Sequence, residues 1–121
     1  MAAKSTTRAM SDRHEAFLAT LIDGRTTPGS GNGFANQMDV RNDSDTPYAL
    51  AVDGKSTKAA SISFSLATWD KAVEQAHGEE PALAFRFYHD DRLVRSTDFV
   101  MVTAEFFGNL LDAARLLADS E

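Results

Sequence analysis

Hydrophobic residues recur at helical spacing in three stretches of the chain. The first predicts an amphipathic helix over residues 12–22. A second helix is expected over residues 66–76, with Ser65 as its N-cap. The third covers residues 106–118, and its apolar stripe leaves Leu116 on the polar side. These patterns predict helices near the start, the middle and the end of the chain.

Between these helices, short apolar or alternating runs predict β-strands. We expect strands around residues 39–41, 48–56, 82–88 and 99–102. The first two are separated by a dense run of turn-forming residues and are expected to pair antiparallel. Strands alternating with helices predict an α/β fold, in which one central mixed sheet is flanked by helices. Residues 1–10 are expected to form a flexible arm, and residues 11–121 a single domain.

Composition agrees with one globular domain. The chain has 121 residues, of which 43% are apolar and 25% charged, and this is enough to build a core without disulfide or metal. It has no cysteine, which excludes disulfides and thiolate metal sites. No apolar leader or membrane-length run is present, so we expect a soluble protein of the cytoplasm of a bacterium or of a phage-infected host.

The net charge of -6 argues against a nucleic-acid partner, but the charge is unevenly distributed. Residues 1–58 carry seven basic and seven acidic side chains, whereas residues 59–121 carry five basic and eleven acidic ones. A divalent cation held by acids of the first half would make that half locally positive. Phosphate binding depends on this local field, so the acidic total does not exclude DNA.

Two acids and a lysine lie on the predicted strands in an order that metal-dependent phosphodiesterases use. Side chains on a strand alternate, so Asp53 and Lys55 are expected on one face, and Gly54 on the other. Asp39 on the neighbouring strand would complete a pair of carboxylates, which suits magnesium or manganese. Lys55 would then orient the attacking water and stabilise charge on the phosphate. Glu15, on the preceding helix, is expected to complete the site.

A glycine-rich segment over residues 25–33 offers a second functional candidate. It is a surface loop in the simpler interpretation. In the functional one, its backbone approaches a phosphate, and Arg25, Ser30 and Asn32 donate hydrogen bonds to it.

The order of these motifs resembles the PD-(D/E)xK nuclease superfamily. Glu15 comes first, then the glycine-rich loop, then Met38-Asp39-Val40, and then an apolar strand that ends in Asp53-Gly54-Lys55 and is followed by a helix. The chain is most similar to the small archaeal-type Holliday junction resolvases and to compact phage-encoded nucleases, over about residues 11–102. The resemblance implies a restriction-endonuclease-like sheet, with helix, active-site strands, helix and further strands in that order.

The resemblance also implies an activity and roles for residues. It implies Mg²⁺- or Mn²⁺-dependent hydrolysis of DNA by a homodimer that acts on branched DNA, as in recombination. Glu15, Asp39 and Asp53 match the metal-binding acids, and Lys55 matches the catalytic lysine. Positions expected to contact DNA are Arg25, Ser30, Asn32, Arg41 and Lys58.

Two alternatives remain open. Asp53 stands where relatives more often have glutamate, which favours a weakly active or inactive nuclease-fold protein that binds nucleic acid or a protein partner. A non-nuclease α/β domain is the other alternative. Among the remaining candidates, we expect His14 on the helix surface and residues 89–91 in a turn rather than in a metal site. Three aromatic residues are expected in the core rather than in a base-stacking platform, namely Phe64, Trp69 and Phe85.

Overall fold

The computed structural model describes residues 2–26, 38–42 and 49–120 of the chain. The elements in these ranges are, in order, α1 (Ala2–Leu21), β1 (Gly24–Thr26), β2 (Val40–Asn42), β3 (Leu50–Thr57), α2 (Leu66–Gln75), β4 (Glu80–Tyr88), β5 (Ser96–Met101) and α3 (Ala104–Asp119). The predicted contacts of Ser30 and Asn32 with DNA, and most of the turn before β3, lie outside the described residues.

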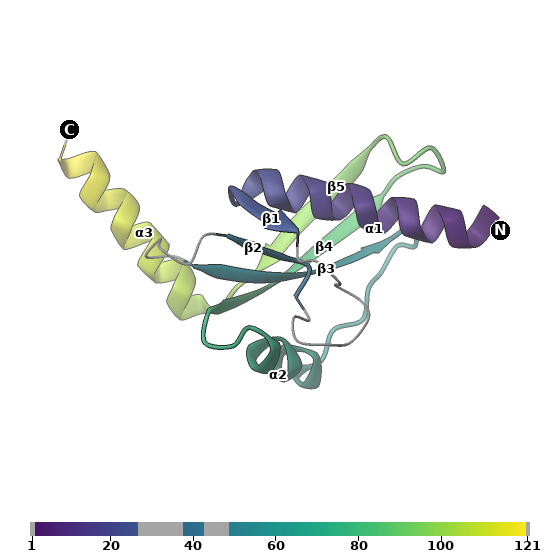
Figure 1. Ribbon diagram of the computed structural model, residues 1–121. Helices are drawn as coiled ribbons and strands as arrows, with labels where there is room; N and C mark the ends of the chain where they lie inside the picture. The colour runs from purple at the N-terminus through teal and green to yellow at the C-terminus, as the bar shows by residue number, and fades with distance from the viewer. Residues whose placement is uncertain (1, 27–37, 43–48, 121) are drawn as a thin grey trace.

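The strands form one mixed sheet in the order β1-β2-β3-β4-β5. β2 is antiparallel to both of its neighbours, β3 and β4 are parallel, and β5 is antiparallel to β4. Helix α1 covers one face of this sheet and α2 the other, whereas α3 extends away from it (Figure 1). The predicted class, a single α/β domain with a mixed sheet flanked by helices, is therefore confirmed.

Each face of the sheet has its own apolar core. On the α1 face, Leu18 packs with Val52 and Ala82, all of them buried. On the α2 face, Leu83 and Phe85 pack with residues that include Ala72 and Ala76 of α2 and its C-cap. β4 is buried at six of its nine positions, which explains its largely apolar sequence, whereas β3 is apolar only in its first half.

The first helix begins at Ala2, ten residues before the predicted start. Residues 2–10 therefore belong to α1 and not to a separate arm. Met10 is buried against Tyr88 and Leu93 of the β4–β5 hairpin, and the Tyr88 hydroxyl donates a 2.9 Å hydrogen bond to the Met10 carbonyl. Because these contacts join residues far apart in the sequence, periodicity within the first 22 residues did not predict the longer helix.

Strand β1 was not predicted from the sequence. It has only three residues, too few to show a period, and it exists because Gly24 and Arg25 pair with Asn42 and Arg41 of β2. A Cβ atom on Gly24 would lie 2.5 Å from the Arg41 carbonyl oxygen, so this close approach requires glycine.

The predicted helix and strand starts otherwise agree with the structure to within three residues. Ser65 caps α2 as expected, accepting a hydrogen bond of 3.3 Å from the Thr68 amide. Thr103 caps α3 in the same way, at 3.1 Å from the Phe106 amide. Across the described ranges, no helix combines the length and apolar character that a membrane crossing requires.

The fold predicts opposite outcomes for two glycine-to-alanine substitutions. A Cβ on Gly54 would lie 3.1 Å from His14 Nδ1 and 3.3 Å from Leu18 Cδ1, both in buried side chains that have little room to move. We expect Gly54→Ala to lower the free energy of unfolding by about 1–3 kcal/mol through overpacking. Urea unfolding followed by circular dichroism measures this loss.

Gly108→Ala is the matched control, because nothing lies within 4 Å of the added methyl group on α3. Alanine is the better helix former, so this variant should gain about 0.5–1 kcal/mol. Equal stability of the two variants would contradict the close packing of α1 on β3.

Candidate functional site

Asp39 is held against the middle of β3 by its backbone and its side chain. Its amide donates a 3.0 Å hydrogen bond to the Val52 carbonyl. Its carboxylate Oδ2 accepts a 2.7 Å hydrogen bond from the Gly54 amide. These two hydrogen bonds are made to the residues before and after Asp53. The carboxyl groups of Asp39 and Asp53 therefore lie side by side, next to the start of β2.

Burial raises the pKa of the Asp39 carboxyl to about 7, although the hydrogen bond from Gly54 opposes this rise. The neighbouring carboxyl of Asp53 raises the pKa further, and Glu15 adds a smaller effect. Two acids in a partly buried position are costly when both are ionised. A bound cation would remove this repulsion, so the electrostatics of the pair favour a divalent metal ion.

Lys55 lies on the same face of β3 as Asp53, as the strand period predicts. Its Nζ atom is 3.2 Å from Asp53 Oδ2, and 45% of its side chain remains exposed. Gly54, between them, faces α1 on the opposite side of the sheet. The predicted Asp53 and Lys55 pair therefore forms, with the ammonium group accessible to a ligand.

Glu15 lies on α1 and acts on the pair through its charge. In the described part of the chain, no three histidine, aspartate or glutamate side chains are grouped so as to hold a metal ion. The donor set that does form is the pair Asp39 and Asp53. It fits Mg²⁺ or Mn²⁺, because magnesium commonly takes one or two protein carboxylates and fills its other positions with water and phosphate oxygens.

His14 is buried, not exposed as we expected. Only 2% of its surface is accessible, and its ring lies against Gly54 beneath α1. Burial, together with the charge of Arg86, lowers its pKa to about 4, so the ring is neutral at pH 7. The spacing Met10, His14, Leu18 marks one buried helix face, and this signal was present in the sequence.

The predicted DNA contacts have different surroundings. Arg41 pairs with Glu79 and donates to the carbonyls of Gln75 and Ala76, so it binds the C-terminal end of α2 and is not oriented toward a ligand. Arg25 is exposed on β1. Lys58 follows β3 and makes an exposed 3.3 Å ion pair with Asp91. Arg25 and Lys58 therefore remain candidates for phosphate contacts.

The turn expected at residues 89–91 is confirmed. These residues lie in the hairpin between β4 and β5, where the His89 ring pairs with the Thr97 hydroxyl at 2.7 Å. Of the aromatic residues expected in the core, Phe85 is buried and Trp69 is partly buried on the α2 face, but Phe64 is 43% exposed, so the prediction for Phe64 is wrong.

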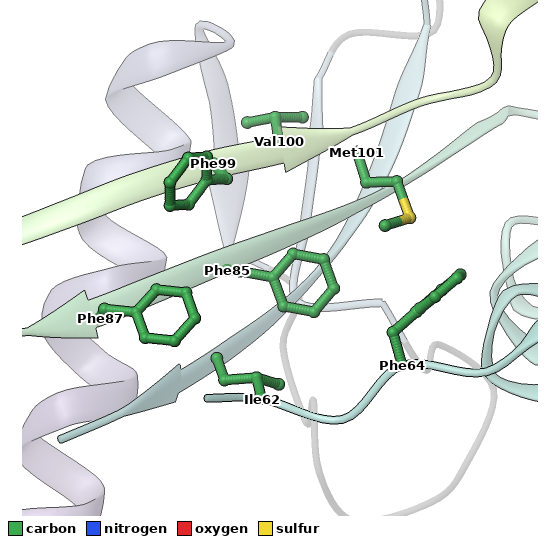
Figure 2. Close-up of a pocket in the computed structure, with 7 residues that line it drawn as sticks. All are labelled: Ile62, Phe64, Phe85, Phe87, Phe99, Val100 and Met101. Carbon is green, nitrogen blue, oxygen red and sulfur yellow. The ribbon is translucent and has the colours of Figure 1, made fainter. Parts of the chain in front are cut away.

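An apolar pocket beside Lys55 was not predicted. It is lined largely by phenylalanine side chains from β4, β5 and the segment before α2 (Figure 2). Its sequence signal is the alternation of Phe85 and Phe87 on β4, of which Phe85 was expected in the core.

Comparison of the chain with protein-family models, with curated proteins and with solved structures returns no match. Functional inference therefore rests on the residues and their geometry.

The raised pKa of Asp39 predicts a pH-dependent effect of Asp39→Asn. The folded chain keeps a proton on Asp39 that the unfolded chain releases between about pH 4 and pH 7, so this group lowers stability as the pH rises through that window. Asparagine keeps the acceptor for the Gly54 amide without the charge. We expect Asp39→Asn to be more stable than wild type by about 1–2 kcal/mol at pH 8, with little difference near pH 4.

Urea unfolding at the two pH values measures this difference, and Asp70→Asn on the exposed surface of α2 is the control. Adding Mg²⁺ or Mn²⁺ at pH 8 should stabilise the wild type but not Asp39→Asn, because ligand binding to the folded state adds stability. A wild-type advantage over Asp39→Asn at pH 8 without metal would contradict the assignment.

Proposed function

We propose that this chain is a metal-dependent DNA endonuclease of the PD-(D/E)xK type that acts on branched DNA, as a Holliday junction resolvase does. The observation that carries the proposal is the grouping of Asp39, Asp53 and Lys55. Two carboxyl groups lie together on adjacent segments, and an accessible lysine ammonium lies 3.2 Å from one of them.

The order of elements supports the same proposal. The resemblance implies a helix, active-site strands, a second helix and further strands, and α1, β1 to β3, α2, β4 and β5 follow in that order. Asp39 immediately precedes β2 and Asp53 lies on β3, so both acids are at the strands where the resemblance expects them. Within the described residues, Lys55 is the only lysine that lies on a strand.

The distribution of charge is compatible with DNA. Three of the acids responsible for the net charge of -6, Glu105, Asp112 and Asp119, lie on α3, which extends away from the sheet (Figure 1). Lys55 is exposed beside the carboxylate pair, and Lys58 is exposed beyond the end of β3. With a divalent cation held by the pair, a local positive field at the site is consistent with an acidic total.

Each residue of the site has a distinct task in phosphodiester hydrolysis. Asp39 and Asp53 would hold the divalent cation, which supplies Lewis acidity and lowers the pKa of water. The Gly54 amide fixes the Asp39 carboxylate through its hydrogen bond. The Lys55 ammonium is placed to orient the attacking water and to stabilise negative charge on the phosphate. Neutral, buried His14 supports the opposite side of β3 and has no direct part in the chemistry.

We also propose that the enzyme is a homodimer joined through α3. This helix has a single buried residue, Phe106, while Phe107, Leu111 and Leu117 are 42–65% exposed on or beside its apolar stripe. An apolar stripe of this length on a small domain is typical of an interface. A second copy is the partner that a cutter of both strands of branched DNA requires, because it supplies a second, symmetry-related site.

The proposed roles of the site residues predict that their substitution slows cleavage of DNA but leaves binding of DNA intact. We expect Asp53→Asn and Lys55→Met to cut a four-way junction roughly 100-fold or more slowly than wild type in Mg²⁺, because each removes a group needed for the chemistry. Asp70→Asn and Lys71→Met, adjacent exposed positions on α2, are matched charge controls and should cut normally. Gel assays of cleavage and fluorescence anisotropy of binding measure the two steps.

Wild-type binding without cleavage in either metal would favour the inactive nucleic-acid-binding alternative. Absence of both binding and cleavage would favour a non-nuclease domain.

The dimer proposal predicts a monomer when the α3 stripe is made polar. The double variant Leu111→Lys with Leu117→Lys should halve the mass measured by light scattering, because charged side chains at an apolar interface are costly to bury. Leu116→Lys lies off the stripe and, being 71% exposed, should leave the mass unchanged. A wild-type monomer at all concentrations would rule out this interface.

A further inference from the structure

An apolar pocket opens on the α2 face of the sheet, outside the group of Asp39, Asp53 and Lys55. Its volume is about 470 Å³, within the range of sites for small ligands. The side chains around it include Ile62, Phe64, Phe85, Phe87, Phe99 and Met101 (Figure 2). Phe64 and Phe99 are 43% and 56% exposed, which is unusual for phenylalanine beside an otherwise buried core.

The rings are arranged with their faces and edges toward one another, and the outer rings remain open. Phe87 and Phe99 form an edge-to-face pair with centroids 6.1 Å apart, and Phe64 and Phe85 form another at 6.4 Å. The pocket therefore offers aromatic surfaces for stacking to a flat, uncharged ligand.

The register of the sheet places this pocket next to the candidate catalytic residues. Phe85 is the pairing partner of Lys55 on the parallel strands β3 and β4, and Phe87 is the partner of Thr57. Paired residues on neighbouring strands point to the same face and lie about 5 Å apart. A ligand in the pocket would thus lie one strand away from the Lys55 side chain, on the same side of the sheet.

Cations border the aromatic surface on the side of β3. Lys55 and Lys58 leave 45% and 41% of their side chains exposed. A second pocket of about 560 Å³ shares Phe87 and Phe99 with the first and is also lined by Lys58. Flat apolar surface flanked by ammonium groups is complementary to a nucleotide, whose base stacks and whose phosphate is negative. A helix from a second copy would cover the apolar surface but would bring no phosphate to Lys55 and Lys58, which stay partly exposed although each pairs with an aspartate.

We propose that the pocket holds an unpaired nucleobase of the DNA substrate, next to the phosphate that Lys55 contacts. The inference rests on the proposed nuclease function and adds a substrate preference to it. DNA in which a base is unpaired at the branch would be bound better than DNA of the same shape without that base. Phe99 and Phe64 supply the exposed stacking surfaces, and Lys58 contacts the adjoining backbone.

The test compares two branched DNAs that differ by one base. One carries an unpaired thymine beside the branch, and the other an abasic site at the same position. Binding to wild type is measured by fluorescence anisotropy with EDTA, and cleavage is measured separately in Mg²⁺. We expect wild type to bind the thymine substrate about 5- to 100-fold more tightly than the abasic one, the range given by base stacking on an aromatic ring.

Phe99→Ala should reduce this preference to about twofold or less. Phe99 is more than half exposed on the edge strand β5, so the variant is expected to fold, which circular dichroism verifies. Leu66→Ala, at a 72% exposed apolar position outside the pocket, is the matched control and should keep the full preference.

Equal binding of the two DNAs by wild type would overturn the inference, and normal cleavage in the same experiment would show that the nuclease proposal still stands. If wild type cleaves neither DNA but still binds the thymine substrate more tightly, the base-binding site stands and the proposed nuclease activity is rejected. A preference that is unchanged in Phe99→Ala would also overturn the base site. Loss of the dimer in that variant would overturn it too, and would assign the pocket to a second copy.

Discussion

The close contact between α1 and Gly54 organises the molecule. His14 and Leu18 approach this position so nearly that a side chain on residue 54 would meet them at 3.1–3.3 Å. Since α1 occupies that face of β3, the neighbouring side chains Asp53 and Lys55 must point to the other. The Gly54 amide also holds the Asp39 carboxylate at 2.7 Å. One glycine thus supports the core on one side and the candidate site on the other.

The site places a carboxyl group that favours its neutral form next to an ion pair. Burial and the proximity of Asp53 raise the pKa of Asp39, whereas the Lys55 ammonium compensates Asp53 from the exposed side. At such a site, binding of a cation would be coupled to loss of the proton from Asp39. On the same sheet face, the phenylalanine pocket continues from Phe85 without an intervening charged side chain on β4. The charged groups of the site and the aromatic surface of the pocket are therefore adjacent, and this arrangement is complementary to the phosphate and the base of a nucleotide.

Tertiary contacts changed the roles of several residues that looked exposed or free in the sequence. Arg41 seemed available to DNA, but α2 ends beside it with carbonyl groups and Glu79 to bind. His14 seemed a surface residue, but the β-sheet lies beneath it. The first ten residues were expected to form a flexible arm, yet Met10 reaches the β4–β5 hairpin. In each case the deciding partner is at least 34 residues away in the chain.

The sequence by itself determined the class of fold, because apolar periods of two and 3.6 residues distinguish strands from helices. It also determined that Asp53 and Lys55 share a face, because the strand period is local. Only the tertiary structure decided that Asp39 lies against Gly54 and that β1 exists, since both depend on pairing between segments. The exposure of α3 and the opening beside Phe99 were likewise decided by packing, because an apolar pattern marks a surface to be covered without identifying what covers it.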